Sequence, residues 1–481
     1  MTGHDRTTTV GQLPAPTQGQ SRVPAALTRL VWLLWIATLG VLALELRGGG
    51  GWELSGVVAV DGLTAVMWVT VTFFSGIVHS YSRRYMAGSR TIDGFFARVF
   101  AFTLVVMLLV AADSLLLFAV AWLVMGLVMA DLIGLNEGWS QAQAAASLAR
   151  RSFLASTGSL AVAFGTLWWH TGTTTVVLAA AGALVLAAMI QSALVPFQGW
   201  LLSSMTAPTP ASALMHAGFV NAGGILLVRF APVVTVDPAA MLAIVLVGAT
   251  SALLGKLLKT VQPDVKGKLG CSTVGQMGFM IMQAGLGFFG AAIAHLILHG
   301  FYKAYQFLTA GSRVDHESPT KQRSDGSVGA LGVAVIGLTA LAGGALFAAL
   351  TGKGAKLDSG LLLTMLVVLT VMHAAREVVA EAAVPAVIRY GAVPAVALPA
   401  LAVYAAVFRA IDGLLAGLPA VGQPAELTAI HGLVAAAFLV TYLAIGTGVY
   451  RRSTRLYVAL LNTAQPAADT LLTAPEEYNE Y

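Results

Sequence analysis

The chain has 481 residues, of which 57% are apolar and 10% charged, whereas a soluble globular domain is about one quarter charged. This composition excludes an ordinary soluble protein and predicts an all-α polytopic membrane protein with about 20 apolar residues per span. The net charge of +5 does not indicate nucleic-acid binding, because Lys and Arg are spread through short loops. The single cysteine, Cys271, excludes a disulfide framework and a Cys-based metal site, so we expect no cofactor in this chain.

The chain divides into three parts by hydropathy. Residues 1–23 are predicted to be a disordered tail, residues 24–450 a transmembrane bundle, and residues 451–481 a short C-terminal tail. The bundle is expected to hold about 14 helices. In chain order they cover 24–46, 55–80, 98–113, 115–135, 152–170, 173–195, 208–231, 239–258, 269–288, 290–311, 328–350, 359–388, 391–416 and 428–450.

The distribution of basic residues predicts the orientation, because Lys and Arg favour cytoplasmic loops. When the predicted spans alternate in direction, 20 of the 27 Lys and Arg residues fall on the side that carries both termini. Four fall on the other side and the rest lie inside spans. Both termini are therefore predicted to be cytoplasmic.

Two polar residues in the first half are candidates for function, since an ionisable group at the centre of a membrane helix costs on the order of 3 kcal/mol. Asp113 joins two short apolar runs and lies either on a proton pathway or at the N-cap of the next helix. His216 follows Pro208 and Pro210, which predict irregular backbone of the kind found beside ion pathways. Its alternative role is packing, with a hydrogen bond to Asn221 or to a neighbouring helix.

The strongest pattern is in the run AAIAHLILHGFYKAYQF, where His295, His299 and Lys303 occupy positions i, i+4 and i+8. This spacing places the three side chains on one face of a helix, about 6 Å apart per step. Such a stripe can pass a proton through intervening water. In the alternative interpretation each histidine satisfies a buried carbonyl.

A similar spacing of four residues relates His373, Glu377 and Glu381, which form either a pathway or a salt-bridged face at the membrane surface. Lys256 is close enough to its apolar run to be partly buried, and it is also a candidate, with snorkelling to the surface as the alternative. No nucleotide-binding loop, haem-spaced histidine pair or Ser/His/Asp arrangement is evident. The residues therefore predict an ion-translocating protein rather than an enzyme, for protons or for Na⁺.

Three runs carry a family resemblance: SALVPFQGWLLSSMTAPTPASALMHAGFVNAGGILLVR over 192–229, STVGQMGFM from Ser272, and HLILHGFYKAYQFLTAGS from His295. They resemble the proton-conducting antiporter-like subunits of respiratory complex I and of multisubunit cation/proton antiporters. The resemblance implies two inverted five-helix repeats with a broken helix in each. It also implies that His216 serves the first half of the pathway, and His295, His299 and Lys303 the second half.

Two positions depart from the pattern of this family. The family has a glutamate directly after the tryptophan where this chain has Leu123 after Trp122, and a lysine where this chain has Gln191 before Ser192. The ion pair of the first half-channel is therefore missing. Asp113, Asp131 or His216 takes its place, or only the second half conducts.

Within the family, LVPFQGWLLSSMTAPTPASALMHAGFVNAGG is most similar to the DabB membrane subunits of inorganic-carbon accumulation complexes. This resemblance implies a bacterial inner-membrane protein partnered by a cytoplasmic DabA-like zinc protein with a carbonic-anhydrase-like site. The ion flow would then drive conversion of CO₂ to bicarbonate in the partner. The alternative is a proton-pumping subunit of a complex I-like or hydrogenase-linked redox complex.

Overall fold

The computed structural model describes residues 21–48, 51–169, 173–313, 329–380, 385–422 and 424–471. These residues are mostly helical, and the sheet among them is a hairpin of two strands, β1 (Trp52–Leu54) and β2 (Val58–Val60). The predicted all-α membrane protein is therefore confirmed. Most of the predicted N-terminal tail, residues 1–20, and Glu381 lie outside the described residues.

The first half of the chain forms six long helices and then a series of short ones. The long helices are α1 (Val23–Leu46), α2 (Gly62–Tyr85), α3 (Ile92–Ala111), α4 (Leu115–Ile133), α5 (Ser140–Trp168) and α6 (Thr174–Gln191). The short ones are α7 (Gly199–Ser203), α8 (Thr209–Ala217), α9 (Ala222–Arg229) and α10 (Ala231–Val234). Side-chain caps start several helices, as where Asp61 accepts the amide of Thr64 at 2.8 Å and Ser114 accepts that of Leu117 at 3.1 Å.

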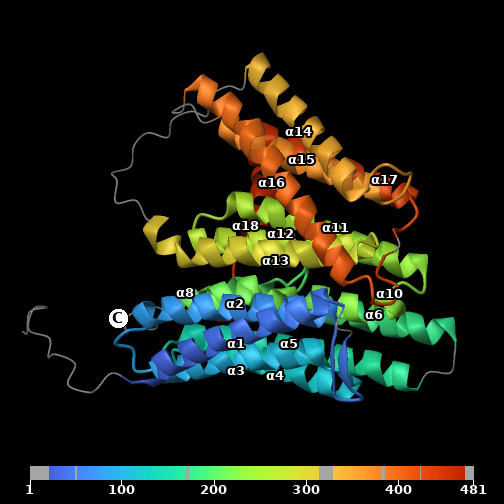
Figure 1. The fold of residues 1–481 in the computed structure, drawn as a ribbon. Coiled ribbons are helices and arrows are strands. Elements are labelled where there is room, and N and C mark those ends of the chain that lie inside the picture. Colours follow the sequence, from blue (N-terminus) through green and yellow to red (C-terminus); the bar gives the residue numbers. More distant parts are fainter. Residues whose placement is uncertain are drawn as a thin grey trace, which may run out of the picture.

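The second half continues with long helices. They are α11 (Pro238–Val261), α12 (Val265–Gly285), α13 (Phe289–Leu308), α14 (Ala330–Thr351), α15 (Gly360–Ala380), α16 (Ala386–Leu414) and α17 (Ala429–Thr447), followed by the shorter α18 (Thr454–Thr463). Figure 1 shows α11–α13 as a layer between the first-half helices on one side and α14–α17 on the other. This central layer contacts the helices on both of its sides, as where α13 packs against α8 and against α16.

Eleven helices in the described ranges are long and apolar enough to cross a membrane, with Thr209–Arg229 counted as one. Each of the 14 predicted spans overlaps a helix of the structure, but α5, α12 and α13 do not meet this criterion. Polar residues interrupt their apolar runs, as the two histidines and the lysine of α13 illustrate. The structure agrees with a multi-pass membrane protein, and the number of 14 spans stays a prediction.

The helices α11 and α12 pack against each other at close range, and glycines permit their approach. A Cβ added at Gly278 would come within 2.5 Å of the backbone nitrogen of Ala252, and one at Gly248 within 2.5 Å of that of Met282. Small residues at helix interfaces are the usual way for membrane helices to pack tightly. This contact fixes α12, which carries one part of the candidate site.

The backbone is irregular between α6 and α9, as the prolines predict. After α6 the chain turns through residues 192–198, where Ala193 has a left-handed φ of 54°. Ala207 is extended, Pro208 precedes α8, and a 3₁₀ turn over Phe219–Asn221 separates α8 from α9. The predicted irregular backbone before His216 is confirmed, whereas the inverted repeats stay a prediction.

Part of the predicted C-terminal tail is folded against the bundle. Leu460 of α18 and Ala464 are buried with Leu258 and Val261 of α11, and Gln262 donates to the carbonyl of Ala464. Residues 451–471 therefore form an ordered extension of the bundle.

The β1–β2 hairpin lies at the opposite end of the bundle, beside an ion pair of Arg229 with Asp61. Arg229 also donates to the carbonyl of Val110 at 2.7 Å, so that one side chain links α2, α3 and α9. Burial alone would raise the pKa of Asp61, but the hydrogen bonds and charge of Arg229, together with Thr64, lower it below its ordinary value. The carboxylate is therefore charged at neutral pH and holds this end of the bundle together.

Candidate functional site

Three helices bring polar side chains together at one point, which we call the conduction junction. Nδ1 of His216 on α8 lies 2.9 Å from the hydroxyl of Thr273 on α12. The Thr273 hydroxyl donates to the carbonyl of Leu269 at 2.9 Å, and Nζ of Lys303 on α13 donates to the same oxygen at 2.8 Å. The junction therefore joins His216 to Lys303 through a hydroxyl and a carbonyl.

The hydrogen-bond directions at the junction assign the tautomer of the histidine. The single hydroxyl hydrogen of Thr273 is donated to Leu269, so Nδ1 of His216 is the donor in the contact with Thr273. Nε2 is then the acceptor nitrogen, and it has no hydrogen-bond partner in the described part of the chain. His216 can therefore accept a proton at Nε2 and release one from Nδ1.

The junction is closed to solvent. His216, Thr273 and Lys303 are each 0% exposed, and the ring of His216 stacks on Phe307 with centroids 4.4 Å apart. A buried ammonium is costly unless it is compensated, and none of the ion pairs within the described ranges includes Lys303. A lysine in this setting is unusual for a structural role, so Lys303 stays a candidate for function.

The three predicted residues of α13, which we call the α13 stripe, lie along one face as expected. The rings of His295 and His299 are 5.7 Å apart and within 17° of parallel, and Nε2 of each has no hydrogen-bond partner among the described residues. His299 is buried and His295 half-buried. In the alternative interpretation each histidine satisfies a buried carbonyl. Among the described residues, Nε2 of neither histidine makes such a bond.

Lys256 and His373 form a second polar contact, with Nζ 2.7 Å from Nε2. It joins α11 in the central layer to α15, and both residues are half-buried. Glu377 follows one helical turn later on α15, and its side chain is outside the described set. Lys256 and His373 are therefore brought together, and neither takes part in the hydrogen bonds of the conduction junction.

The structure separates Asp113 from the junction. Its side chain is exposed, and its carboxylate accepts the amide of Gly56 beside the hairpin at 2.7 Å. The next helix is capped by Ser114 rather than by Asp113. Asp131, the other carboxylate considered for the first half, pairs at the surface with Arg150 at 2.9 Å. Neither carboxylate takes part in the hydrogen bonds of the conduction junction, and a role for either in the first half stays a prediction.

The positions that depart from the family pattern are filled by uncharged side chains. Gln191 is 0% exposed, and both of its amide atoms have no hydrogen-bond partner in the part of the chain that the structure describes. Leu123 is half-buried, and Trp122 beside it donates to Ser156 at 3.1 Å. The first half therefore lacks an ionisable pair at the place where the family has one.

Three groups of the site were not predicted from the sequence. Thr273 lies within the STVGQMGFM run, but a threonine in a membrane helix gives no signal by itself. The carbonyl of Leu269 cannot be identified without coordinates. His79 on α2 is fully buried, but a single histidine in a predicted span does not by itself predict a site. No three His, Cys, Asp or Glu side chains are arranged to hold a metal ion within the described residues.

Comparison with known families identifies the chain. Residues 112–388 match the family model described as NADH:quinone oxidoreductase/Mrp antiporter, TM, and residues 49–96 match that of the NADH-Ubiquinone oxidoreductase (complex I), chain 5 N-terminus. The chain belongs to this antiporter-like family. The family resemblance predicted from the sequence is therefore confirmed.

Several relatives in the antiporter-like family are named for inorganic carbon or for quinone oxidoreduction. The chain is 40% identical over 316 residues to a probable inorganic carbon transporter subunit DabB of Bacillus subtilis. The matched segment covers 62% of this chain and 60% of the relative. It is 38% identical to a probable DabB1 of Halothiobacillus neapolitanus, over 55% of this chain and 50% of the relative. It is 36% identical to NADH-quinone oxidoreductase subunit L of Mycobacterium tuberculosis, over 65% of this chain and 53% of the relative.

The chain thus spans between one half and three fifths of the length of these relatives. A solved structure, the Mrp complex from Dietzia sp. DQ12-45-1b, covers 95% of this chain and 51% of the matched chain, with a TM-score of 0.54 and 23% identity. This likeness establishes the fold of the antiporter-like family. The DabB relatives are named as transporter subunits, in agreement with the prediction that this chain is a transport subunit rather than an enzyme.

Proposed function

We propose that this chain is the membrane subunit of an inorganic-carbon accumulation complex and that it conducts protons to drive a cytoplasmic partner. The observation that carries the proton-conducting part is the conduction junction, where buried His216 and Lys303 meet through Thr273 and one carbonyl. The inorganic-carbon part is supported by the relatives named DabB, which match at 38–40% identity.

Protons rather than Na⁺ suit this site because its ionisable groups are nitrogens. Hard cations are bound by several oxygen ligands, whereas imidazole and ammonium nitrogens exchange protons. Along α13 a proton passes from His295 to His299 and then to Lys303 over two steps of about 6 Å, with water between them. The carbonyl of Leu269 accepts from both Thr273 and Lys303, so it orients the two groups, and water carries the proton between them. Release of a proton from Lys303 to this water leaves a neutral amine, and uptake at Nε2 of His216 makes an imidazolium.

The partner in this proposal is a cytoplasmic DabA-like protein whose own zinc site performs the carbonic-anhydrase-like chemistry. The chain itself lies in a bacterial inner membrane with both termini in the cytoplasm, as the basic residues predict. Proton flow past the junction changes the charge of Lys303 and His216, and this change is passed to the partner as the driving force for hydration of CO₂ to bicarbonate.

A second candidate is a proton-pumping subunit of a complex I-like or hydrogenase-linked redox complex. It is favoured by the match to NADH-quinone oxidoreductase subunit L of Mycobacterium tuberculosis over 65% of this chain. In that case electron transfer in other subunits would move the same protons through the same junction.

Purification of the native complex through a tag on this chain separates the two candidates. The proposed function expects a soluble subunit that contains zinc, and conversion of CO₂ to bicarbonate that stops when the membrane is made permeable to protons. Co-purifying flavin or iron–sulfur subunits without a zinc protein would overturn the inorganic-carbon proposal in favour of the redox complex.

A further inference from the structure

The helix α2 carries a line of buried polar residues that the junction does not use. Thr64, Ser75, His79 and Ser82 are each 0% exposed. At about 100° per residue, the four lie within about 60° of one another around the helix. Their span of 18 residues rises about 27 Å, close to the roughly 30 Å of the hydrocarbon core. We call these four residues the α2 column.

His79 is the ionisable member of the column. Its Nδ1 lies 2.8 Å from the carbonyl of Ser75, so this nitrogen carries the hydrogen, and Nε2 is an acceptor without a partner among the described residues. The hydroxyl of Ser75 is 3.2 Å from Nδ1 and 2.6 Å from the hydroxyl of Thr103 on α3. The histidine is therefore connected to a pair of hydroxyls on the side toward the membrane centre.

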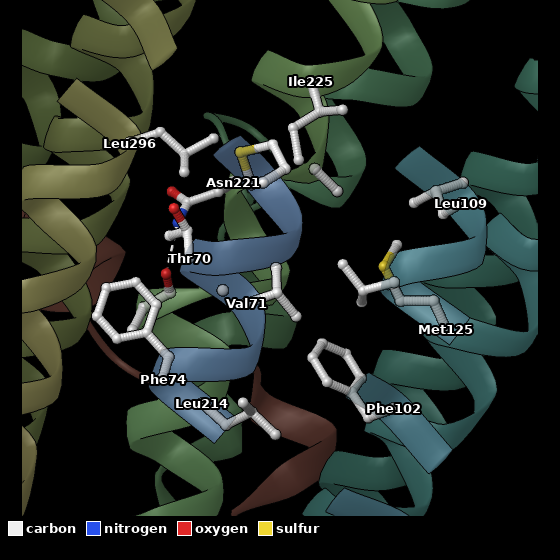
Figure 2. A pocket seen from close by; sticks show the side chains of 15 residues that line it. Thr70, Val71, Phe74, Phe102, Leu109, Met125, Leu214, Asn221, Ile225 and Leu296 are labelled. Atoms are coloured by element: carbon white, nitrogen blue, oxygen red, sulfur yellow. Dashed lines mark hydrogen bonds between the residues drawn. The ribbon is translucent and has the colours of Figure 1, made fainter. Parts of the chain in front are cut away.

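A cavity lies where the column is interrupted between Thr64 and Ser75. Met67 and Val71 of α2 face it there, and the space for the centres of water molecules is about 20 Å³, room for about one water. Figure 2 shows the lining, which is mostly apolar. Thr70, Leu109, Ala217, Asn221 and Ile225 are among the other lining residues.

Asn221 gives this apolar cavity a polar point. It is 0% exposed, its Nδ2 donates to the carbonyl of Ala217 at 2.7 Å, and its Oδ1 has no hydrogen-bond partner in the described part of the chain. A buried carbonyl oxygen without a partner is costly, and a water in the cavity would satisfy it. Because Ala217 follows His216 in α8, the cavity also lies next to the helix of the conduction junction.

Beyond the cavity, the column ends at a charged cluster. Arg229 donates to the hydroxyl of Thr64 at 2.5 Å and is paired with Asp61. Leu109 and Ile225, which line the cavity, lie within one helical turn of Val110 and Arg229 of this cluster. Polar groups therefore follow α2 from Ser82 at one end to Asp61 at the other, with a single apolar constriction.

We propose that α2 carries a first-half proton route, centred on His79, in place of the ion pair that Leu123 and Gln191 do not supply. The inference rests on the proposed function as a proton-conducting subunit. A proton bound at Nε2 makes an imidazolium, and transfer of the Nδ1 proton to the Ser75 hydroxyl, which gives its own proton to Thr103, returns the neutral ring. The proton then passes to Thr103 and, when the cavity is hydrated, past Asn221 to Thr64. The apolar constriction acts as the gate, since dewetting of such a segment stops conduction.

The test measures proton uptake by proteoliposomes that hold the tagged complex, driven by a K⁺ diffusion potential and read with a pH-sensitive dye. His79→Gln is expected to lower the rate at least about 10-fold, and Val71→Ser is expected to raise it several-fold by wetting the constriction. Thr72→Val is the matched control. Thr72 is 0% exposed and lies within about 20° of His79 around the same helix, but its hydroxyl is 3.2 Å from that of Thr38 on α1 and outside the His79–Ser75–Thr103 contacts. The rate of proton uptake in Thr72→Val should stay within about 2-fold of the wild type.

The outcomes distinguish this inference from the proposed function. Rates equal to the wild type in both His79→Gln and Val71→Ser, with loss of flux in Lys303→Ala, overturn the α2 route and leave the proposed function standing. A wild-type complex that conducts no better than empty liposomes overturns both. Where His79→Gln does not assemble, Asn221→Leu replaces it, and an unchanged rate in that variant contradicts the route.

Discussion

The helices α13 and α2 each carry buried polar residues across the membrane, but with different chemistry. The α13 stripe has three ionisable side chains within nine residues, and Lys303 is tied to α12 and α8 through the carbonyl of Leu269. The α2 column has one histidine among hydroxyls and is interrupted by an apolar cavity. The difference indicates that α13 can hold a proton at several places, whereas α2 passes one only when its constriction is hydrated.

The largest effect is expected from the stripe. Lys303→Ala removes the only lysine of the junction, so proton flux should fall at least about 100-fold, and growth that depends on inorganic-carbon accumulation should be lost. Lys268→Ala is the control, because Lys268 is an exposed lysine on α12. The same assay applies to His299→Ala. If Lys303→Ala kept wild-type flux with an intact complex, the α13 stripe would not be on the pathway and the comparison would fail.

A smaller loss is expected when the link between α8 and α13 is cut. Thr273→Val removes the hydroxyl that joins His216 to the Leu269 carbonyl, and loss of about 1.4 kcal/mol of hydrogen bonding corresponds to a rate about 10-fold lower. Thr273→Ser keeps the hydroxyl and should restore the rate to within about 2-fold. Equal rates in the two variants would mean that the junction is not on the pathway.

The same contrast explains how much could be predicted from the sequence. Charged residues are rare in this chain, so a lysine and two histidines at spacing four were recognisable, and each predicted span overlaps a helix. Serine and threonine are common in membrane helices, where they often bond a carbonyl four residues earlier, so the α2 column gave no signal. The alternative that Asp113 caps the next helix was wrong for another reason, because hydropathy does not show that the hairpin brings Gly56 to its carboxylate while Ser114 caps the helix.

The charged end of the α2 column should affect stability more than flux. Arg229→Met leaves Asp61 without its partner and should cost about 2 kcal/mol of unfolding free energy, seen as a lower melting temperature of the purified complex. Arg150→Met is the control, since its pair with Asp131 is half exposed and such pairs contribute 0–1 kcal/mol. An equal loss in the two variants would contradict a special role for Arg229.

This ion pair also predicts a pH dependence with a definite sign. Because the pKa of Asp61 is lowered in the folded protein, the stabilisation is complete above the ordinary carboxyl value near 4 and is lost as the pH falls through the lower folded value. The difference in melting temperature between wild type and Arg229→Met should therefore be constant from pH 7 to about pH 5 and should shrink below about pH 4. A difference that grows on acidification would contradict the assignment.

The smallest expected effect tests whether the first half uses α2 or the position that carries lysine in the family. Gln191 is buried with both amide atoms unpartnered in the described part of the chain, so Gln191→Leu should raise the unfolding free energy by about 1 kcal/mol and leave the flux within about 2-fold. Gln283→Leu is the matched control. Gln283 is equally buried but donates to the Tyr404 hydroxyl at 3.2 Å, so its loss should destabilise the complex instead. A large drop in flux for Gln191→Leu would place the amide on the pathway, and the first half would then resemble the family more than its residues indicate.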